Sequence, residues 1–63
     1  MTHEKALHLL IKHMESYKTY IKCEIDIAKE SEDEDRKRTE MGRLFLISAL
    51  LNTAYDLDAK ATN

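Results

Sequence analysis

The polar side chains best placed to do chemistry lie close together in the first half of the chain. They recur at spacings of four, three and four residues, which places them on one helix face as a candidate recognition ridge of His13, Tyr17, Tyr20 and Glu24. A carboxylate within an apolar surface needs a hydrogen-bonding partner, and a tyrosine hydroxyl can supply one. The ridge is therefore either a polar pocket for a partner or the wet edge of a helical bundle, where Glu24 pairs with a basic residue. We favour the bundle edge.

The histidines do not have the spacing of a metal site. Zinc and di-iron sites on helices use ligands about three or four residues apart, because such residues share a face. His3, His8 and His13 are five residues apart and point to different sides of a helix. Glu4 and His8 are four residues apart, but they belong to the charged face that we expect to be solvated. We expect neither a metal nor another cofactor.

Nucleophilic and phosphate chemistry lack their usual residues. Cys23 is the only cysteine, has no histidine beside it in the sequence, and belongs to an apolar flank where a buried thiol is usual. Gly42 is the only glycine, so the chain has no glycine-rich phosphate loop. We expect Gly42 to let another helix approach closely. The chain is not expected to be an enzyme.

Long helices must position these residues. The chain has 63 residues, no proline and one glycine, and most of its residues are good helix formers. Thr2 is a candidate N-cap for a first helix over about residues 2–29. A second helix is expected over about residues 32–60, after a turn at about residues 30–31. Two helices joined by so short a turn pack antiparallel.

Capping chemistry predicts where the second helix starts. Ser31 and Glu34 match a capping box, in which each side chain accepts a hydrogen bond from the other residue's backbone amide. Acidic residues then precede basic ones in three pairs four residues apart: Glu32–Arg36, Asp33–Lys37 and Glu34–Arg38. Each such pair stabilises a helix by about 0.2–0.5 kcal/mol. Together these features place the hinge of the hairpin at Glu30–Ser31.

The apolar residues of the first helix form one stripe. They recur at spacings of three and four residues: Leu7, Leu10, Met14, Tyr17, Ile21, Ile25 and Ala28. The second helix is apolar nearly all round, so it must be buried nearly all round, and one partner helix covers only one stripe of it. We therefore expect an all-α antiparallel hairpin that dimerises into a four-helix bundle. The residues expected to carry self-association are Leu44, Ile47, Leu50, Leu51, Ala54 and Leu57.

The charge balance does not favour a nucleic-acid binder. The net charge is −2, and lysines alternate with acidic residues, whereas phosphate binding favours a field of one sign. The predicted hairpin dimer nevertheless resembles in architecture Rop, a plasmid RNA-regulating protein that is a dimer of short helical hairpins, although no sequence motif is shared. This resemblance implies, as an alternative, a helical-hairpin dimer that binds RNA or DNA.

The expected function follows from small size, surplus apolar area and missing catalytic motifs. We expect one domain over residues 1–63, with no signal peptide and no apolar run of the about 20 residues that a membrane span requires. A single free thiol is typical of a reducing cytoplasm. The leading hypothesis is a cytoplasmic regulator or inhibitor of bacterial or phage type, a homodimer that binds a target protein through its helical surface. A second alternative, a metal- or ligand-holding helical bundle, depends on the recognition ridge.

Overall fold

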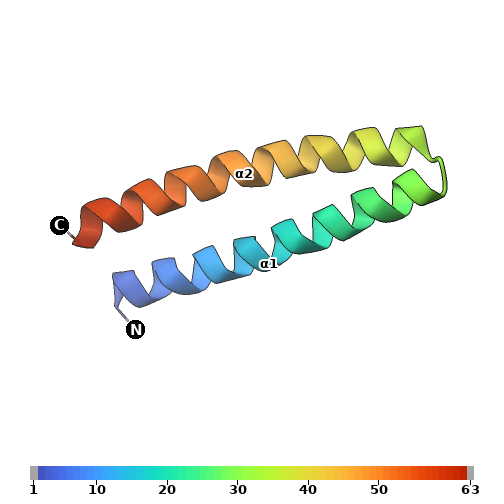
Figure 1. The fold of residues 1–63 in the computed structure, drawn as a ribbon. Coiled ribbons are helices and arrows are strands. Elements are labelled where there is room, and N and C mark those ends of the chain that lie inside the picture. The colour runs from blue at the N-terminus through green and yellow to red at the C-terminus, as the bar shows by residue number, and fades with distance from the viewer. Residues whose placement is uncertain (1, 63) are drawn as a thin grey trace.

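The computed structural model describes residues 2–62, with the side chains of residues 2–60, as an antiparallel pair of helices (Figure 1). Helix α1 spans His3–Glu30 and helix α2 spans Glu34–Thr62. The described part of the chain contains no strand, so the predicted all-α hairpin is confirmed. Residues 1 and 63 of the predicted domain lie outside the described range. Neither helix as described has a stretch both long and apolar enough to cross a membrane.

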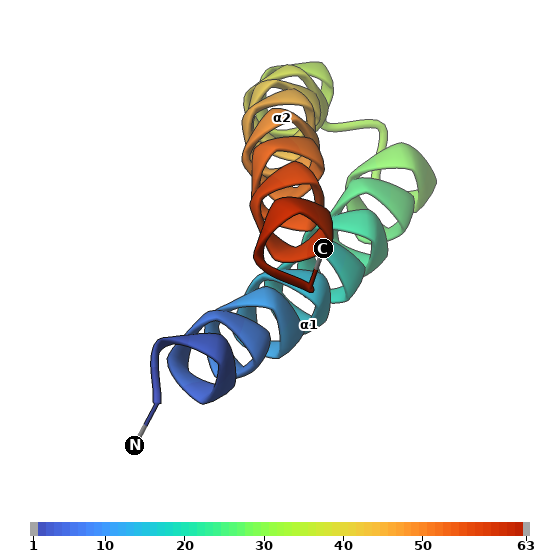
Figure 2. The same ribbon diagram turned by 90° about the vertical axis from the view of Figure 1, so that its left-hand side faces the viewer.

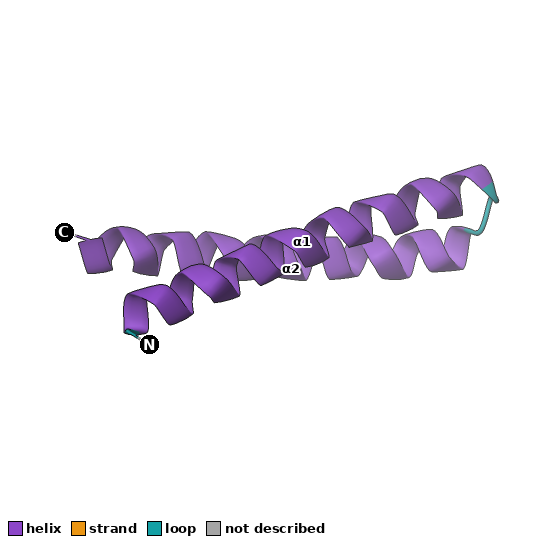
Figure 3. Cartoon of the chain, turned by 90° about the horizontal axis from the view of Figure 1, so that it is seen from below, coloured by secondary structure: helices purple, strands orange, loops and turns teal. Residues whose placement is uncertain are grey.

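The hairpin is a thin plank with two broad faces. Its principal extents are 46 × 18 × 11 Å. Figures 2 and 3 show that the two helices cross at a shallow angle, as expected when two long helices pack along a repeating apolar stripe. The radius of gyration is 14.5 Å, whereas a compact domain of this length has one of about 10.6 Å. The elongated shape leaves a large surface for the mass of the chain.

Each helix begins at a side-chain cap. The Thr2 hydroxyl accepts a hydrogen bond from the backbone amide of Lys5 at 3.2 Å, which confirms the predicted N-cap. Helix α2 is capped by Asp33, whose Oδ1 accepts from the amide of Arg36 at 3.1 Å. The prediction that Ser31 caps α2 through a capping box is therefore wrong. The hydroxyl of Ser31 instead donates to the carbonyl oxygens of Ile27 and Ala28, at the C-terminal end of α1.

The connection between the helices is longer than predicted because α1 ends in a Schellman motif. The amide of Asp33 donates to Ala28 and that of Glu32 to Lys29, which satisfies carbonyls at the end of α1. This geometry needs a left-handed residue, and Glu32 supplies it with φ of 57°. Residues 31–33 thus form the turn, so the predicted pairs that start at Glu32 and Asp33 cannot form within a helix. The structure instead shows Lys37 near Glu34, at 3.9 Å.

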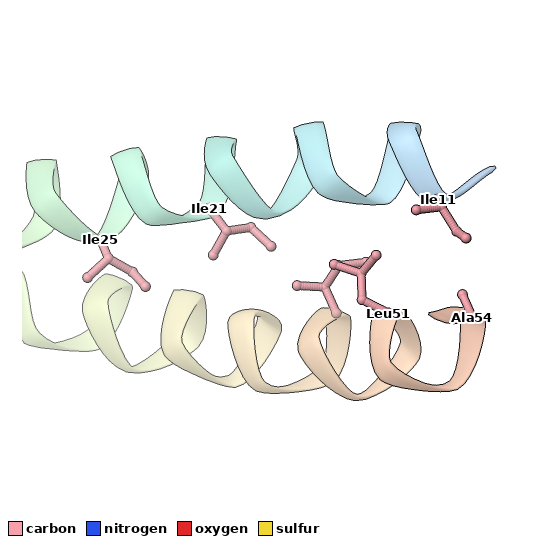
Figure 4. Packing of buried hydrophobic residues seen from close by; sticks show 6 residues of the cluster. Ile11, Ile21, Ile25, Leu51 and Ala54 are labelled. Atoms are coloured by element: carbon pink, nitrogen blue, oxygen red, sulfur yellow. The ribbon is translucent and has the colours of Figure 1, made fainter. Parts of the chain in front are cut away.

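The two helices meet along a seam with heptad spacing, in which residues alternate at intervals of three and four. Such a repeat has a period of about 3.5 residues and keeps one stripe of each helix against its partner. In Figure 4 the isoleucines of α1 point toward α2, while Leu51 points back toward α1. Ile21 is fully buried and Leu51 is 2% exposed. The seam consists of Leu7, Ile11, Met14, Lys18, Ile21, Ile25 and Ala28 from α1, and of Lys37, Glu40, Leu44, Ile47, Leu51, Ala54 and Asp58 from α2.

The seam corrects the predicted stripe of the first helix at two positions. Leu10 and Tyr17 were expected to face the partner helix, but they are 52% and 43% exposed. Ile11 and the half-buried Lys18 take their places. The reason is geometric: only the set with a strict heptad spacing stays in line with α2 over the whole length of the hairpin.

Candidate interaction surface

One broad face of the plank is apolar on both helices; we call it the open face. A hollow on this side is lined by Tyr17 of α1 together with Arg43, Leu46 and Leu50 of α2, so residues of both helices meet there. Seven of the eleven exposed large hydrophobic side chains among the described residues follow this side at heptad spacing. They are Leu10, Tyr17, Tyr20 and Ile27 of α1, and Leu46, Leu50 and Leu57 of α2.

The opposite broad face is joined by polar contacts; we call it the linked face. Tyr55 of α2 donates a hydrogen bond of 2.6 Å to the Glu15 carboxylate of α1. His8 of α1 and Asp58 of α2 are 2.7 Å apart. The hydrogen bond to Glu15, with smaller contributions from desolvation and from the carboxylate charge, raises the pKa of Tyr55 above its ordinary value of 10.0. These contacts bridge the helices on the side where α1 exposes mainly charged residues.

The recognition ridge lies on the open face. The rings of Tyr17 and Tyr20 are stacked with centroids 6.3 Å apart and an interplanar angle of 27°. Glu24 has 15% of its side chain exposed and pairs with the guanidinium of Arg36, from the other helix. His13 is exposed on the same side. The tyrosines are also exposed, so within the single hairpin the ridge lies on an open surface and not in an enclosed pocket.

The six residues predicted for self-association divide between two places. Leu44, Ile47, Leu51 and Ala54 lie in the seam and pack with residues of α1. Leu50 and Leu57 lie on the open face and are 50% and 53% exposed. The structure therefore leaves only these last two of the six accessible to a second chain. Their accessible neighbours come from both helices, not from α2 alone.

Sequence reasoning missed a carboxylate within the seam. Glu40 is 6% exposed, and its Oε1 accepts a hydrogen bond of 2.6 Å from Arg43. Its Oε2 is buried and has no hydrogen-bond partner among the described residues. The heptad pattern could have revealed this position. Glu40 is three residues after Lys37 and four before Leu44, and a residue at that spacing in a heptad repeat faces the partner helix.

The remaining candidate residues do not assemble into a site. Cys23 is exposed rather than buried, because it lies on the side of α1 that faces away from α2. Gly42 has no atom within 4 Å of a Cβ placed on it, so the expected close approach of another helix does not occur within the hairpin. Among residues 2–60, no three histidine, cysteine or acidic side chains are grouped as a metal site would require.

Comparison with known proteins gives no relative: no family model, no curated protein and no solved structure matches this chain.

Proposed function

We propose that this protein is a helical interaction module that pairs with a second copy through the open face and binds a target protein as a regulator or inhibitor. The observation that carries the proposal is the gathering of seven exposed large hydrophobic side chains on one face. Scattered apolar side chains are normal on a protein surface, but a gathering of large apolar side chains on one face marks an interaction site. Among the described residues, no group of histidine, cysteine or acidic side chains that could hold a metal competes with it.

The exposed area agrees with a missing partner. The chain exposes 5020 Å², whereas a compact monomer of its 7.4 kDa exposes about 4,200 Å². The excess of about 800 Å² equals what one partner contributes to a standard protein interface. A second copy of this chain therefore has the right size to bring the exposed surface into the normal range.

The shape of the open face suits a symmetric pair. Both helices contribute to it, so two copies related by a two-fold axis would stack helix against helix into a four-helix bundle. The apolar residues would form its centre. The ion pair of Glu24 and Arg36 would lie toward the turn end of this surface, where each charge keeps its partner.

Light scattering on matched variants tests the pairing. Leu46→Glu and Leu50→Glu introduce a charge on the open face and should reduce the mass from twice 7.4 kDa to 7.4 kDa, because an unpaired buried carboxylate costs several kcal/mol. Phe45→Glu is the matched control, since Phe45 is 79% exposed and lies beside Leu46 but off the open face. It should remain a dimer. A wild-type chain that is folded and monomeric at high concentration would contradict the proposal.

Target binding needs its own test. A target that docks on the dimer should bind the wild type in proportion to its dimer content and should bind the monomeric Leu50→Glu variant more weakly. Circular dichroism of this variant checks that the helices persist. If the monomeric variant keeps full target affinity, pairing is not part of the function.

A further inference from the structure

A second apolar patch lies on the linked face, away from the proposed pairing surface. Phe45 is 79% exposed and is the most exposed large hydrophobic side chain described. Met41 is 51% exposed and precedes it by one helical turn. A hollow beside them is lined by Met41, Glu34, Lys37 and Arg38. The patch therefore combines an apolar centre with basic side chains; we call it the basic patch.

Two lysines of α1 lie on the same face as this patch. The hydrogen bond between Glu15 and Tyr55 defines the linked face on both helices. Lys22 and Lys29 follow Glu15 at intervals of seven residues, which is two helical turns. Met41 precedes Tyr55 by fourteen residues, which is four turns, so it returns to the same side of α2. The lysines and the apolar centre therefore share one face of the hairpin.

Most basic groups of the patch have no acidic partner within ion-pair distance. Lys22, Lys29 and Arg38 form no ion pair within the described residues. Lys37 has a single acidic contact, Glu34 at 3.9 Å, which is at the limit of an ion pair. Asp26, four residues after Lys22 and three before Lys29, shares this face, and Glu34 lines the hollow. The four basic side chains of the patch therefore outnumber its two acidic ones, although the chain as a whole carries a net charge of −2. This local surplus gives the patch a field that attracts carboxylates.

We propose, building on the proposed function, that the basic patch docks an acidic amphipathic helix of the target protein. Apolar side chains of that helix would cover Met41 and Phe45, while its flanking carboxylates would meet Arg38 and the two lysines. Helix-in-groove recognition uses this combination of apolar anchors and peripheral charge. A dimer formed through the open face leaves the linked face uncovered, so both surfaces can be occupied at once.

A pair of synthetic peptides tests the charge preference. The first is a fluorescein-labelled amphipathic helix with a leucine face flanked by glutamates, and the second carries lysines in place of those glutamates. The acidic peptide should raise its fluorescence anisotropy on binding, and the affinity should fall as salt screens the charges. The lysine peptide should not bind. Failure of the acidic peptide to bind, or equal binding of both peptides, would overturn the proposal.

Variants locate the binding. Phe45→Ser should weaken the acidic peptide by about tenfold or more, as loss of a central aromatic anchor does. Arg38→Glu should weaken it and flatten its salt dependence. Leu9→Ser is the matched control, because Leu9 is 55% exposed but lies on the side of α1 that faces away from α2; it should bind as the wild type does. Unchanged binding by Phe45→Ser would place the peptide elsewhere and refute the assignment.

Two further readouts separate this inference from the proposed dimer. Light scattering on Phe45→Ser should give the wild-type mass; a reduced mass would mean that Phe45 serves self-association and not docking. A labelled RNA or DNA strand should not compete with the acidic peptide. Competition that is lost in Arg38→Glu would show that the patch binds phosphates and would overturn the peptide assignment. A monomeric wild type that still binds the acidic peptide would refute the dimer alone.

Discussion

The two broad faces of the hairpin use their residues for opposite purposes. On the linked face, Tyr55 reaches Glu15 and His8 reaches Asp58, so polar side chains connect the helices. On the open face, one ion pair near the turn connects the helices and the remaining length exposes leucines, tyrosines and an isoleucine. Polar contacts thus join the helices at more points on the linked face, while most of the open face keeps its apolar area exposed.

This difference teaches where the stability of so small a protein must come from. A two-helix hairpin buries only one stripe of each helix, and short chains have marginal cores. Surface hydrogen bonds and ion pairs add little, about 0–1 kcal/mol each. Burial of the open face would add far more, because each buried large apolar side chain contributes about 1.5–3 kcal/mol. The linked face therefore adds little energy, and the open face holds the energy available for assembly.

The largest expected change in stability distinguishes a residue of the seam from a residue of the open face. Leu51→Ala should lower the free energy of unfolding by about 3 kcal/mol, at any protein concentration, because Leu51 is buried within one chain. Leu50→Ala removes the same atoms from a side chain that is 50% exposed. Its cost should appear only at concentrations where the chains pair. Urea denaturation over a range of protein concentrations measures both, and identical behaviour of the two variants would remove the distinction.

A smaller effect concerns the carboxylate between the faces. Glu40→Leu should raise the free energy of unfolding by about 1–3 kcal/mol, because a buried ionic group is often less stable than a packed apolar one. Its unpartnered Oε2 strengthens this expectation. The exposed Glu30 provides a control, since Glu30→Leu should change stability by less than about 0.5 kcal/mol. A loss of stability in Glu40→Leu would show that this carboxylate is fully paired.

The smallest effect tests the linked face by pH. In a Tyr17→Phe, Tyr20→Phe background, Tyr55 is the only tyrosine, and its phenol absorbance should titrate above pH 10.0. Because the pKa is raised in the folded chain, the hydrogen bond stabilises the fold below pH 10.0 and this contribution is lost as pH rises through the shifted pKa. Glu15→Gln removes the carboxylate and should move the midpoint back toward 10.0. If Glu15→Gln leaves the titration midpoint of Tyr55 unchanged, the hydrogen bond between Tyr55 and Glu15 does not persist in solution.

The sequence predicted the ends of the helices with uneven success. Thr2 caps α1 as expected, because an N-cap depends only on local residues. The start of α2 was placed too early, because Ser31 and Asp33 are both capping residues and a pattern alone does not rank them. The end of α1 decides which of the two caps α2. Glu32 adopts a left-handed conformation there, and the Ser31 hydroxyl donates its hydrogen bond to a carbonyl of α1, which leaves Asp33 as the cap.

The candidate site was predicted in part. All four residues of the recognition ridge lie on one face, since spacing by three and four fixes a shared face on any helix. That the ridge adjoins Leu46 and Leu50 of α2 to make one surface could not be predicted, because it depends on how the two helices are rotated about their axes. The same rotation placed Leu51 in the seam and left Leu50 accessible.

The sequence by itself determined that this chain forms two long helices folded into a hairpin. Helix propensity, the scarcity of breakers and a cluster of capping residues are local properties, and they act without knowledge of the rest of the chain. Only the tertiary structure decided which stripe of each helix meets the other. Helix α2 has apolar residues on several sides, so many rotations bury similar area. The heptad register shared with α1 selects one of them, and that selection creates both the open face and the basic patch.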